Sequence, residues 1–359
     1  MLPQAMPVVL LQHGGLTDLS GKTGLAMLRY RSGPIVAVID PDHAGVALSS
    51  LTGIPRAVPV VADMAAALAY APAAMVVGLA PSGGRLPEAM RQDVLLGLEA
   101  GLNLASGLHS RLAEEPAFAA ACRRPGQWIW DLRREPPGLE VASARCAALP
   151  CRRLLAVGSD MAVGKMSACL ELQAAAHRAG LDARFVGTGQ AGILISGAGI
   201  ALDAVRVDYA AGAVEAAVLA AAAGAGAETL VLVEGQGSLA HPGSTATLPL
   251  LRGSQPTDLL LVHRAGQRRV RSRPDAAPVA VPRLPDLIAV LEGLAALGRP
   301  DGLRPRVQAL ALNTALLGPE EARQAIEQAV ALTGLPCADP VREGGETLLA
   351  ALLGSTAPT

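Results

Sequence analysis

The sequence predicts an α/β protein in which two domains, each built on a parallel sheet, follow one another along the chain. Short apolar runs typical of buried strands alternate with longer runs whose apolar residues have helical spacing. A Gly-Lys loop joins one of these strands to a helix near the middle of the chain. Because 359 residues exceed the usual size of one hydrophobic core, we expect an N-terminal domain over residues 1–148 and a C-terminal domain over residues 149–359.

The composition indicates a cytoplasmic protein that acts on a small molecule. The formal net charge is −1 at pH 7, which gives no long-range attraction to nucleic acid or to an anionic membrane. The five cysteines are odd in number and form no Cys-x-x-Cys pair, as expected in a reducing compartment. The N-terminus lacks a signal-peptide pattern, and glutamates interrupt the alanine-rich run over residues 210–233. We expect no nucleic-acid partner, no membrane partner, no bound metal, and a homo-oligomer, which is common among such enzymes.

The N-terminal domain reads as a Rossmann-like, doubly wound sheet. Its apolar runs are short enough to be buried parallel strands, and helical runs separate them. Ligands of such sheets lie beyond the carboxyl ends of the strands. No complete Gly-x-Gly-x-x-Gly follows these strands, so we predict no dinucleotide site in this domain. The predicted strands cover residues 34–40, 58–61, 74–79 and 102–106, the helices cover residues 62–70 and 86–100, and a proline- and glycine-rich connection covers residues 121–150.

Two loops of this domain follow strands at the edge where ligands bind. One contains Gly83, Gly84 and Arg85, and the other runs from Gly107 to His109. Arg85 could bind a carboxylate or a phosphate with two hydrogen bonds, and His109 could accept or donate a proton. Ordinary turn residues with a surface arginine and a surface histidine would give the same pattern.

The C-terminal domain begins with an apolar strand that leads into a phosphate-binding loop. Gly158 ends the strand, and Gly164 and Lys165 open the helix that follows. Glycines allow backbone N–H groups to approach a phosphate, the helix presents the positive end of its dipole, and the lysine adds a mobile cation. An ordinary strand-to-helix turn is the alternative interpretation.

The loop departs from the usual phosphate-binding pattern at two places. Five residues separate its glycines instead of four, so Ser159 occupies the position of the usual glycine. Met166 replaces the Ser or Thr that normally binds Mg²⁺, and Ser167 follows one residue later.

Later strands of this domain should bring polar residues to the same edge. Glu234 follows a strand, at the position where phosphate-loop proteins place a carboxylate toward Mg²⁺ or an attacking group. His241 could act as a general base if its loop folds back to the cleft, and Asn313 could read a nucleotide base. A turn acid, a surface histidine and a turn-forming asparagine are the alternatives. The strands after the phosphate loop are predicted over residues 183–188, 201–208, 229–233, 258–262 and 307–312.

Six sequence blocks occur together over nearly the whole chain. They are Ala-Pro-Ser-Gly-Gly-Arg-Leu-Pro-Glu at residues 80–88, Ser-Gly-Leu-His at 106–109, Gly-Ser-Asp-Met-Ala-Val-Gly-Lys at 158–165, Thr-Gly-Gln at 188–190, Val-Glu-Gly-Gln-Gly-Ser-Leu at 233–239 with His-Pro at 241–242, and Gly-Ser-Gln-Pro at 253–256. The third block is similar to the extended phosphate loop of dethiobiotin synthetase. Together the blocks resemble a family once catalogued as a domain of unknown function, which includes the D-glutamate N-acetyltransferases. Ala191, Tyr209 and Ala240 depart from its pattern, where Thr, Phe and an aromatic residue are expected, so the acceptor pocket can differ.

The resemblance implies an N-acetyltransferase that moves an acetyl group from acetyl-CoA to the amine of D-glutamate or a related acidic amino acid. Acetyl-CoA carries a pyrophosphate and a 3′-phosphate, so the phosphate loop could bind it without hydrolysing ATP. Glu234 or His241 would take the amine proton, and Lys165 or loop N–H groups would stabilise the oxyanion. The implied catalytic residues are Lys165, Glu234, His241 and Asp160; the implied coenzyme-binding residues are Gly158, Ser159, Asp160, Val163, Gly164, Lys165, Met166, Ser167 and Asn313; the implied acceptor-binding residues are Arg85, His109, Thr188, Gln190 and Gln236.

Two other functions stay open from the residues. An ATP- and Mg²⁺-dependent ligase or kinase would act on a small carboxylate, with Asp160, Ser167 and Glu234 organising Mg²⁺. Lys165 would then stabilise the transferred phosphoryl group. A nucleotide-binding regulatory protein would instead report its ligand by domain closure, without turnover. Metal dependence and ADP release distinguish the first alternative.

Overall fold

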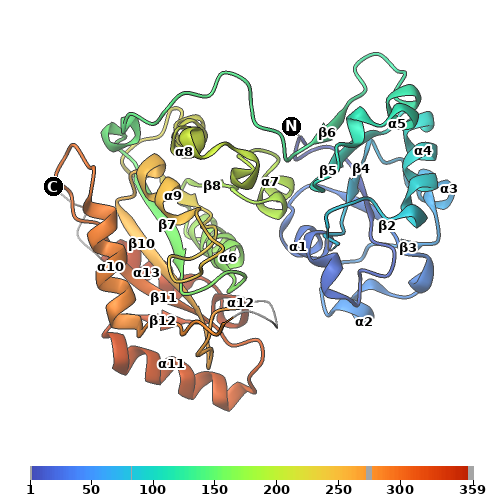
Figure 1. Cartoon of the computed structure of the whole chain (residues 1–359). Coiled ribbons are helices and arrows are strands. Elements are labelled where there is room, and N and C mark those ends of the chain that lie inside the picture. The colour runs from blue at the N-terminus through green and yellow to red at the C-terminus, as the bar shows by residue number, and fades with distance from the viewer. Residues whose placement is uncertain (1, 82, 272–276, 355–359) are drawn as a thin grey trace. The chain divides into compact units, whose positions relative to one another are not determined.

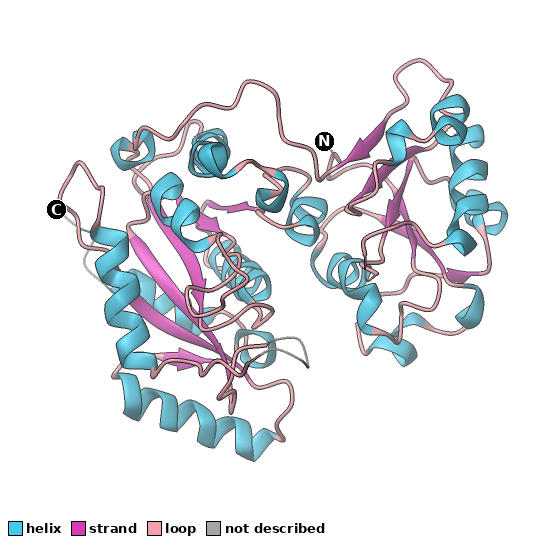
Figure 2. Ribbon diagram, viewed as in Figure 1, coloured by secondary structure: helices cyan, strands magenta, loops and turns pink. Residues whose placement is uncertain are grey.

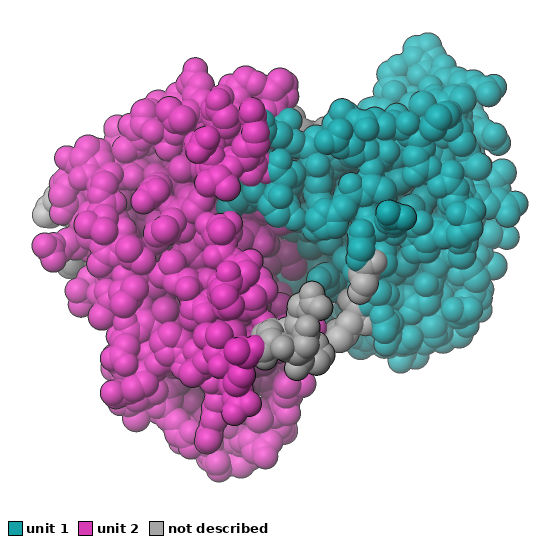
Figure 3. Space-filling view, viewed as in Figure 1, with its two compact units in different colours: residues 1–135, 190–204 teal, residues 136–189, 205–359 magenta. Residues whose placement is uncertain are grey.

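The computed structural model describes residues 2–81, 83–271 and 277–354, which form two compact units (Figures 1 and 2). Unit 1 comprises residues 1–135 and 190–204, and unit 2 comprises residues 136–189 and 205–359 (Figure 3).

Unit 1 contains residues 190–204, which the sequence places in the C-terminal domain. The predicted ranges were 1–148 and 149–359, whereas residues 190–204 pack with unit 1. In this segment, α7 (Gln190–Ser196) packs along α1 (Lys22–Tyr30), and the Arg31 guanidinium donates to the carbonyl oxygen of Leu194 at 3.2 Å. Contacts between residues distant in sequence therefore decide which unit holds this segment.

The sheet of unit 1 has six parallel strands in the order β3-β2-β1-β4-β5-β6. β1 lies between β2 and β4, so the chain changes direction across the sheet at this point. In Rossmann-like domains the ligand crevice lies at this topological switch. The strands are β1 (Val8–Leu11), β2 (Ile35–Ile39), β3 (Val60–Val61), β4 (Ala74–Val77), β5 (Asn103–Ser106) and β6 (Ile129–Asp131).

The core of unit 1 lies between the sheet and a layer of helices. Val9 and Met75 of the central strands pack with Met64, Leu98 and Phe118 of three helices. Along single elements the cluster residues recur at helical spacing, as Val94 and Leu98 do in α4, and at alternate strand positions, as Val9 and Leu11 do in β1. Burial on one face requires this spacing. Besides α1 and α7, the helices are α2 (Leu48–Thr52), α3 (Met64–Ala67), α4 (Arg91–Ala100) and α5 (Pro116–Ala121).

The structure confirms the predicted strands at β2, β3, β4 and β5, and it adds β1 and β6. β6 lies within residues 121–150, where the sequence predicts a connection. β6 has three residues and pairs only with β5, and β1 has four. Strands this short do not establish a readable periodicity, so pairing with neighbours defines them.

The sheet of unit 2 also has six parallel strands, in the order β12-β11-β10-β7-β9-β8. β7 lies beside both β9 and β10, and the register pairs Leu155 with Val233 and Val157 with Leu261. The segments that follow these strands therefore meet at one edge. The strands are β7 (Arg152–Gly158), β8 (Ala183–Val186), β9 (Leu230–Val233), β10 (Asp258–Arg264), β11 (Arg306–Asn313) and β12 (Cys337–Ala338).

The core of unit 2 packs α6 and α13 onto the central strands. Cys169 and Leu172 of α6 and Leu348 of α13 form one cluster with Leu154 and Leu260 of the sheet. Within the described ranges, no helix combines the length and the apolar character needed to cross a membrane. The helices are α6 (Lys165–Arg178), α8 (Val207–Ala221), α9 (Thr247–Ser254), α10 (Leu284–Ala296), α11 (Pro319–Thr333), α12 (Pro340–Glu343) and α13 (Glu346–Gly354).

The two-domain α/β fold class is confirmed, but one predicted strand of the second half is wrong. The segment at residues 201–208 forms a 3₁₀ turn, Leu202–Ala204, and then the start of α8 at Val207. Val207 is 78% exposed, whereas a buried strand would cover it. Short segments with alternating apolar residues do not distinguish a strand from a turn that enters a helix.

Gly212 and Gly293 give a matched pair of stability tests. A Cβ at Gly212 in α8 would lie 1.7 Å from the carbonyl oxygen of Glu140, whereas a Cβ at Gly293 in α10 would meet no atom within 4 Å. We expect Gly212→Ala to lower the free energy of unfolding by about 2 kcal/mol, since backbone must move. We expect Gly293→Ala to raise it by about 0.5–1 kcal/mol, since alanine favours the helix. Urea unfolding followed by circular dichroism measures both free energies. A Gly212→Ala variant with an unchanged free energy of unfolding would contradict the close approach of α8 to Glu140.

Candidate functional site

The phosphate-binding loop joins β7 to α6 at the carboxyl edge of the unit 2 sheet. β7 ends at Gly158 and α6 begins at Lys165. Gly164 has a φ of +112°, which only glycine adopts without strain. A Cβ at Gly158 would lie 2.8 Å from Nζ of Lys165. One glycine is therefore needed for the turn, and the other for the close approach of the lysine.

The loop presents a row of backbone N–H groups. Among the described residues, no protein atom accepts a hydrogen bond from the N–H groups of residues 162–167. The last of these groups belong to the first turn of α6, where helical N–H groups lack intrahelical partners and the helix dipole is positive. Such a row of donors binds anions, and phosphates in particular.

Lys165 lies buried behind these donors. Its Nζ donates to the carbonyl oxygens of Asp160 at 2.9 Å and Gly237 at 2.8 Å. Burial lowers the pKa of Lys165 to about 8, while the Asp160 and Glu234 carboxylates act to raise it. The ammonium thus ties the loop after β7 to the loop after β9.

Asp160 fixes a further segment, residues 265–271, against the phosphate-binding loop. Its Oδ1 accepts the N–H of Met161 at 2.7 Å. Its Oδ2 accepts the side-chain amide of Gln267 at 2.5 Å and the backbone N–H of Arg271 at 2.6 Å. The fully buried Asp160 carboxylate therefore holds the backbone of residues 265–271 in place. The sequence predicts a catalytic role for it as well.

Glu234 follows β9 and holds the loop that follows β8. Its Oε2 accepts the N–H of Thr188 at 2.8 Å and of Gly189 at 3.1 Å, and the Thr188 hydroxyl donates to the Glu234 carbonyl oxygen at 2.8 Å. Burial raises the pKa of Glu234 to about 7, against the two N–H groups and Lys165, which act to lower it. A carboxyl group with this pKa can accept a proton near neutral pH.

Gly235 allows the loop after β9 to lie directly on β7. A Cβ at this position would lie 1.7 Å from the carbonyl oxygen of Ala156 and 2.8 Å from Cδ of Lys165. The neighbouring Gln236 points its amide at Oε1 of Glu234, at 3.3 Å. The structure thus brings Thr188, Glu234 and Gln236 together.

His241 has both ring nitrogens engaged. Its Nδ1 accepts the N–H of Gly243 at 3.0 Å, so Nε2 carries the proton and donates to the carbonyl oxygen of Arg271 at 2.5 Å. In this arrangement the ring has no free lone pair with which to accept a proton. The His241 ring thus links its own loop to the segment at residues 265–271.

The remaining coenzyme-binding candidates line the loop. The Asn313 amide donates to the carbonyl oxygen of Val163 at 3.0 Å, and its oxygen accepts the N–H of Ala315 at 3.1 Å. Met166 and Ser167 are half-buried in the first turn of α6. In the described part of the chain, no group of three or more His, Cys, Asp or Glu side chains is arranged to hold a metal ion.

Arg85, His109 and Gln190 belong to unit 1, whereas the other predicted site residues belong to unit 2. The N–H of His109 donates to the carbonyl oxygen of Gly84 at 2.8 Å, which joins the loops after β4 and β5. Arg85 is exposed and has no partner among the described residues. The Gln190 amide donates to the hydroxyl of Thr23 at 3.0 Å.

His263 and Arg264, the last two residues of β10, and Gln267, which follows that strand, also belong to the site and are not predicted from the sequence. The Ser159 hydroxyl lies 2.7 Å from Nδ1 of His263, whose pKa is lowered by burial. The Arg264 guanidinium donates to the carbonyl oxygen of Ala162 at the tip of the loop, at 2.6 Å, and Gln267 binds Asp160. Only their position in the sequence could have indicated these residues, because the carboxyl ends of neighbouring parallel strands meet at one edge of the sheet.

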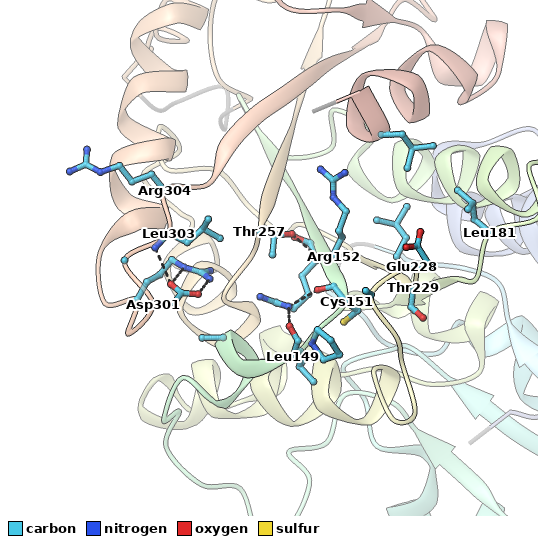
Figure 4. Close-up of a pocket in the computed structure, with 18 of the residues that line it drawn as sticks. Leu149, Cys151, Arg152, Leu181, Glu228, Thr229, Thr257, Asp301, Leu303 and Arg304 are labelled. Atoms are coloured by element: carbon cyan, nitrogen blue, oxygen red, sulfur yellow. Dashed lines mark hydrogen bonds and ion pairs between the residues drawn. The ribbon is translucent and has the colours of Figure 1, made fainter. Parts of the chain in front are cut away.

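A pocket of about 1010 Å³ opens at the amino-terminal edge of the same sheet (Figure 4). The starts of β7 and β9 line it, with Arg152 and Leu230 among its residues. Arg152 pairs with Asp258 at 2.8 Å, and Arg299 pairs with Asp301. Parallel sheets bind ligands at their carboxyl edge, so this pocket is not the candidate site despite its volume.

Comparison with known protein families agrees with these motifs and with the fold. The P-loop domain of the DUF1611 family, a domain of unknown function, matches residues 140–349, and the Rossmann-like N-terminal domain of that family matches residues 41–135. The chain belongs to the DUF1611 family. A crystal structure of a DUF1611 family protein from Anabaena variabilis ATCC 29413 is 49% identical, with a TM-score of 0.88 over 98% of this chain and 100% of that chain.

Two relatives carry the name D-glutamate N-acetyltransferase. The one from Tritonibacter scottomollicae is 36% identical over 279 residues, which cover 77% of this chain and 80% of the relative. The one from Pseudoalteromonas sp. is 32% identical over 278 residues, with the same coverage of both chains. The resemblance predicted from the sequence blocks is therefore confirmed.

The raised pKa of Glu234 predicts a pH-dependent stability. The folded chain holds the carboxyl proton up to about pH 7, whereas an unfolded chain loses it near pH 4.3, so the folded state binds more protons between these values. The free energy of unfolding should therefore fall as the pH rises through this range. Glu234→Gln has no carboxyl group, so its free energy of unfolding should not fall in this way. From pH 4.5 to pH 8, the free energy of unfolding of the variant should therefore rise by about 2–3 kcal/mol relative to that of the unchanged protein.

Urea unfolding of both proteins at several pH values measures this difference. Glu228→Gln, at an exposed position in the same unit, is the control and should show no such gain. A constant difference between Glu234→Gln and the unchanged protein across the pH range would contradict the buried carboxyl.

Proposed function

We propose that this protein is an N-acetyltransferase that transfers the acetyl group of acetyl-CoA to the amine of D-glutamate or a related acidic amino acid. The names of two relatives at 36% and 32% identity support the reaction and the acceptor. The row of free N–H groups beside Lys165 supports a phosphate-bearing donor, and this observation carries the proposal.

The loop suits a donor that keeps its phosphates intact. Acetyl-CoA presents a pyrophosphate and a 3′-phosphate, both of which N–H groups and an ammonium can bind. A kinase or ligase needs Mg²⁺ to bridge the phosphates that it cleaves. Met166 supplies no hydroxyl for that ion, whereas binding an uncleaved pyrophosphate requires none.

The residues around Glu234 suit proton removal from an amine. The ammonium of the acceptor must lose a proton before its nitrogen attacks the thioester carbon. Glu234 takes that proton, since its pKa of about 7 keeps it ionised above neutral pH. The carbon–sulfur bond then breaks, the acetyl group stays on nitrogen, and coenzyme A leaves as a thiolate that gains a proton.

The acceptor carboxylates need donors of their own. We propose Thr188 and Gln236 of unit 2 for this task, since the structure brings both beside Glu234. The side-chain amide of Gln236 carries two N–H donors, of which one points at Glu234.

Lys165→Ala tests the phosphate-binding role. We expect kcat/KM for acetyl-CoA to fall about 10- to 100-fold, because a charge-assisted hydrogen bond contributes about 1.5–3 kcal/mol. Thiol release in the presence of D-glutamate measures it. Arg178→Ala is the matched control, because Arg178 is exposed in the last turn of the same helix and pairs with Glu346 on the surface. Unchanged coenzyme affinity and turnover in Lys165→Ala would remove the central assignment.

The same assay separates the other functions. Stabilisation by ATP and Mg²⁺ alone, with ADP formed on adding a small carboxylate, would replace the transferase with a ligase or kinase. Tight nucleotide binding without any turnover would indicate a regulatory protein.

The pH dependence of catalysis identifies the base. With Glu234 as base, kcat/KM should rise with pH and level off above about pH 7. Glu234→Gln should lose this rise and at least about 100-fold of the rate, whereas His241→Asn should keep the rise. A rise that disappears in His241→Asn instead would assign the proton transfer to His241.

A further inference from the structure

The charged side chains behind the phosphate-binding loop leave no net positive charge there. The ammonium of Lys165 interacts with the carboxyl groups of Asp160 and Glu234, which both act on its pKa. The loop therefore offers N–H groups to a phosphate, but no surplus of cations. Coenzyme A carries a 3′-phosphate besides its pyrophosphate, and a phosphate monoester has a charge close to −2 at neutral pH. A cation for the 3′-phosphate has to come from another segment.

Arginines supply positive charge where β10 ends. Arg264 is the last residue of β10, and Arg268, Arg269 and Arg271 follow it in the chain. The last three are exposed, and none of the four forms an ion pair with a described residue. β10 lies beside β7, so these arginines follow the sheet at the same edge as the phosphate-binding loop.

The guanidinium of Arg264 lies at the tip of the phosphate-binding loop. Its Nη2 donates to the carbonyl oxygen of Ala162 at 2.6 Å. Asn313, which pairs with Arg264 across β10 and β11, donates to the next carbonyl oxygen, that of Val163, at 3.0 Å. A guanidinium has five N–H donors, and the Ala162 oxygen is the one acceptor that the described residues give this group. The other donors stay available for a phosphate at the loop.

The segment at residues 265–271 is fixed beside the same loop. Oδ2 of Asp160 accepts the N–H of Arg271 at 2.6 Å. The Gln267 amide donates to that oxygen at 2.5 Å and to the carbonyl oxygen of Arg269 at 2.9 Å. The backbone of the segment is thus held at the phosphate-binding loop, while its arginine side chains remain exposed.

Val270 decides which side chains of this segment share a face. The backbone around Arg269 pairs antiparallel with residues 279–281, and the N–H of Val270 donates to the carbonyl oxygen of Val279 at 2.9 Å. Val270 is 4% exposed. Because side chains alternate between the two faces of an extended chain, Arg269 and Arg271 lie together on the face opposite Val270. Two guanidinium groups without carboxylate partners are therefore presented on one face, next to the loop.

We propose that Arg269 and Arg271 bind the 3′-phosphate of coenzyme A and so select acetyl donors that carry it. The pyrophosphate lies on the loop N–H groups beside Arg264, and the 3′-phosphate lies against the two arginines of the neighbouring segment. Arginine suits this task, because its planar group binds a phosphate with two hydrogen bonds. The inference rests on the proposed function, since it takes acetyl-CoA as the ligand of the loop.

Calorimetric titration of the full-length protein with coenzyme A and with 3′-dephospho-coenzyme A tests this role. The unchanged protein should bind coenzyme A about 10- to 100-fold more tightly, because the 3′-phosphate adds charge-assisted hydrogen bonds. In Arg269→Ala/Arg271→Ala, the Kd of coenzyme A should rise by the same factor, whereas that of 3′-dephospho-coenzyme A should stay unchanged. A double variant that weakens both ligands equally would keep the preference and overturn the proposal.

Arg178→Ala/Arg252→Ala is the matched control. It removes the same charge from exposed positions of unit 2, in the last turns of α6 and α9, and it should keep the preference for coenzyme A. Circular dichroism checks that each variant is folded. Equal binding of the two ligands by the unchanged protein would overturn the proposal, and so would a control variant that loses the preference.

The same titrations separate this inference from the proposed function. A protein that binds no coenzyme A would overturn both. Coenzyme A binding with the expected preference, but without acetyl transfer to D-glutamate in the thiol-release assay, would overturn the reaction and confirm the 3′-phosphate site. Acetyl transfer with equal kcat/KM for acetyl-CoA and its 3′-dephospho form would support the reaction and overturn the role of Arg269 and Arg271.

Discussion

The candidate site of unit 2 depends on one buried ammonium. Lys165 donates to the carbonyl oxygens of Asp160 and Gly237, which belong to the loops after two neighbouring strands. Removing an ammonium from water costs several kcal/mol, and two carbonyl oxygens offset this only in part, which is why burial lowers the pKa of Lys165. A phosphate is a stronger acceptor than a carbonyl oxygen. A bound phosphate would thus give the buried ammonium of Lys165 a further hydrogen-bond acceptor, in a position that the fold has already fixed.

The two carboxylates of the site illustrate how burial and hydrogen bonding compete. Asp160 receives two backbone N–H groups and an amide, and so serves as an anchor for residues 265–271. Glu234 receives two backbone N–H groups, yet burial still raises its pKa to about 7. Both side chains position loops. Burial also gives Glu234 a pKa suited to accepting a proton from an amine.

The two units use the same construction at different places in the chain. In each, the carboxyl edge of a parallel sheet collects a Gly-Lys helix start and a carboxylate that follows a neighbouring strand. The connections beyond these edges differ: α7 engages Thr23 in unit 1, whereas residues 265–271 engage Asp160 in unit 2. Of the two units, only unit 2 contains the carboxyl group proposed as the base.

The sequence by itself determined the α/β class, most of the strands, the phosphate-binding loop and the family, because these follow from short-range patterns and adjacent residues. The structure confirmed the strand and helix that flank Gly158 and Lys165. Only the tertiary structure decided that β1 and β6 are strands, that residues 190–204 pack in unit 1, and that residues 201–208 are not a strand. It alone also showed that His241 and Asn313 bind nearby backbone. These features depend on hydrogen bonds and packing between residues far apart in the chain, which no local pattern encodes.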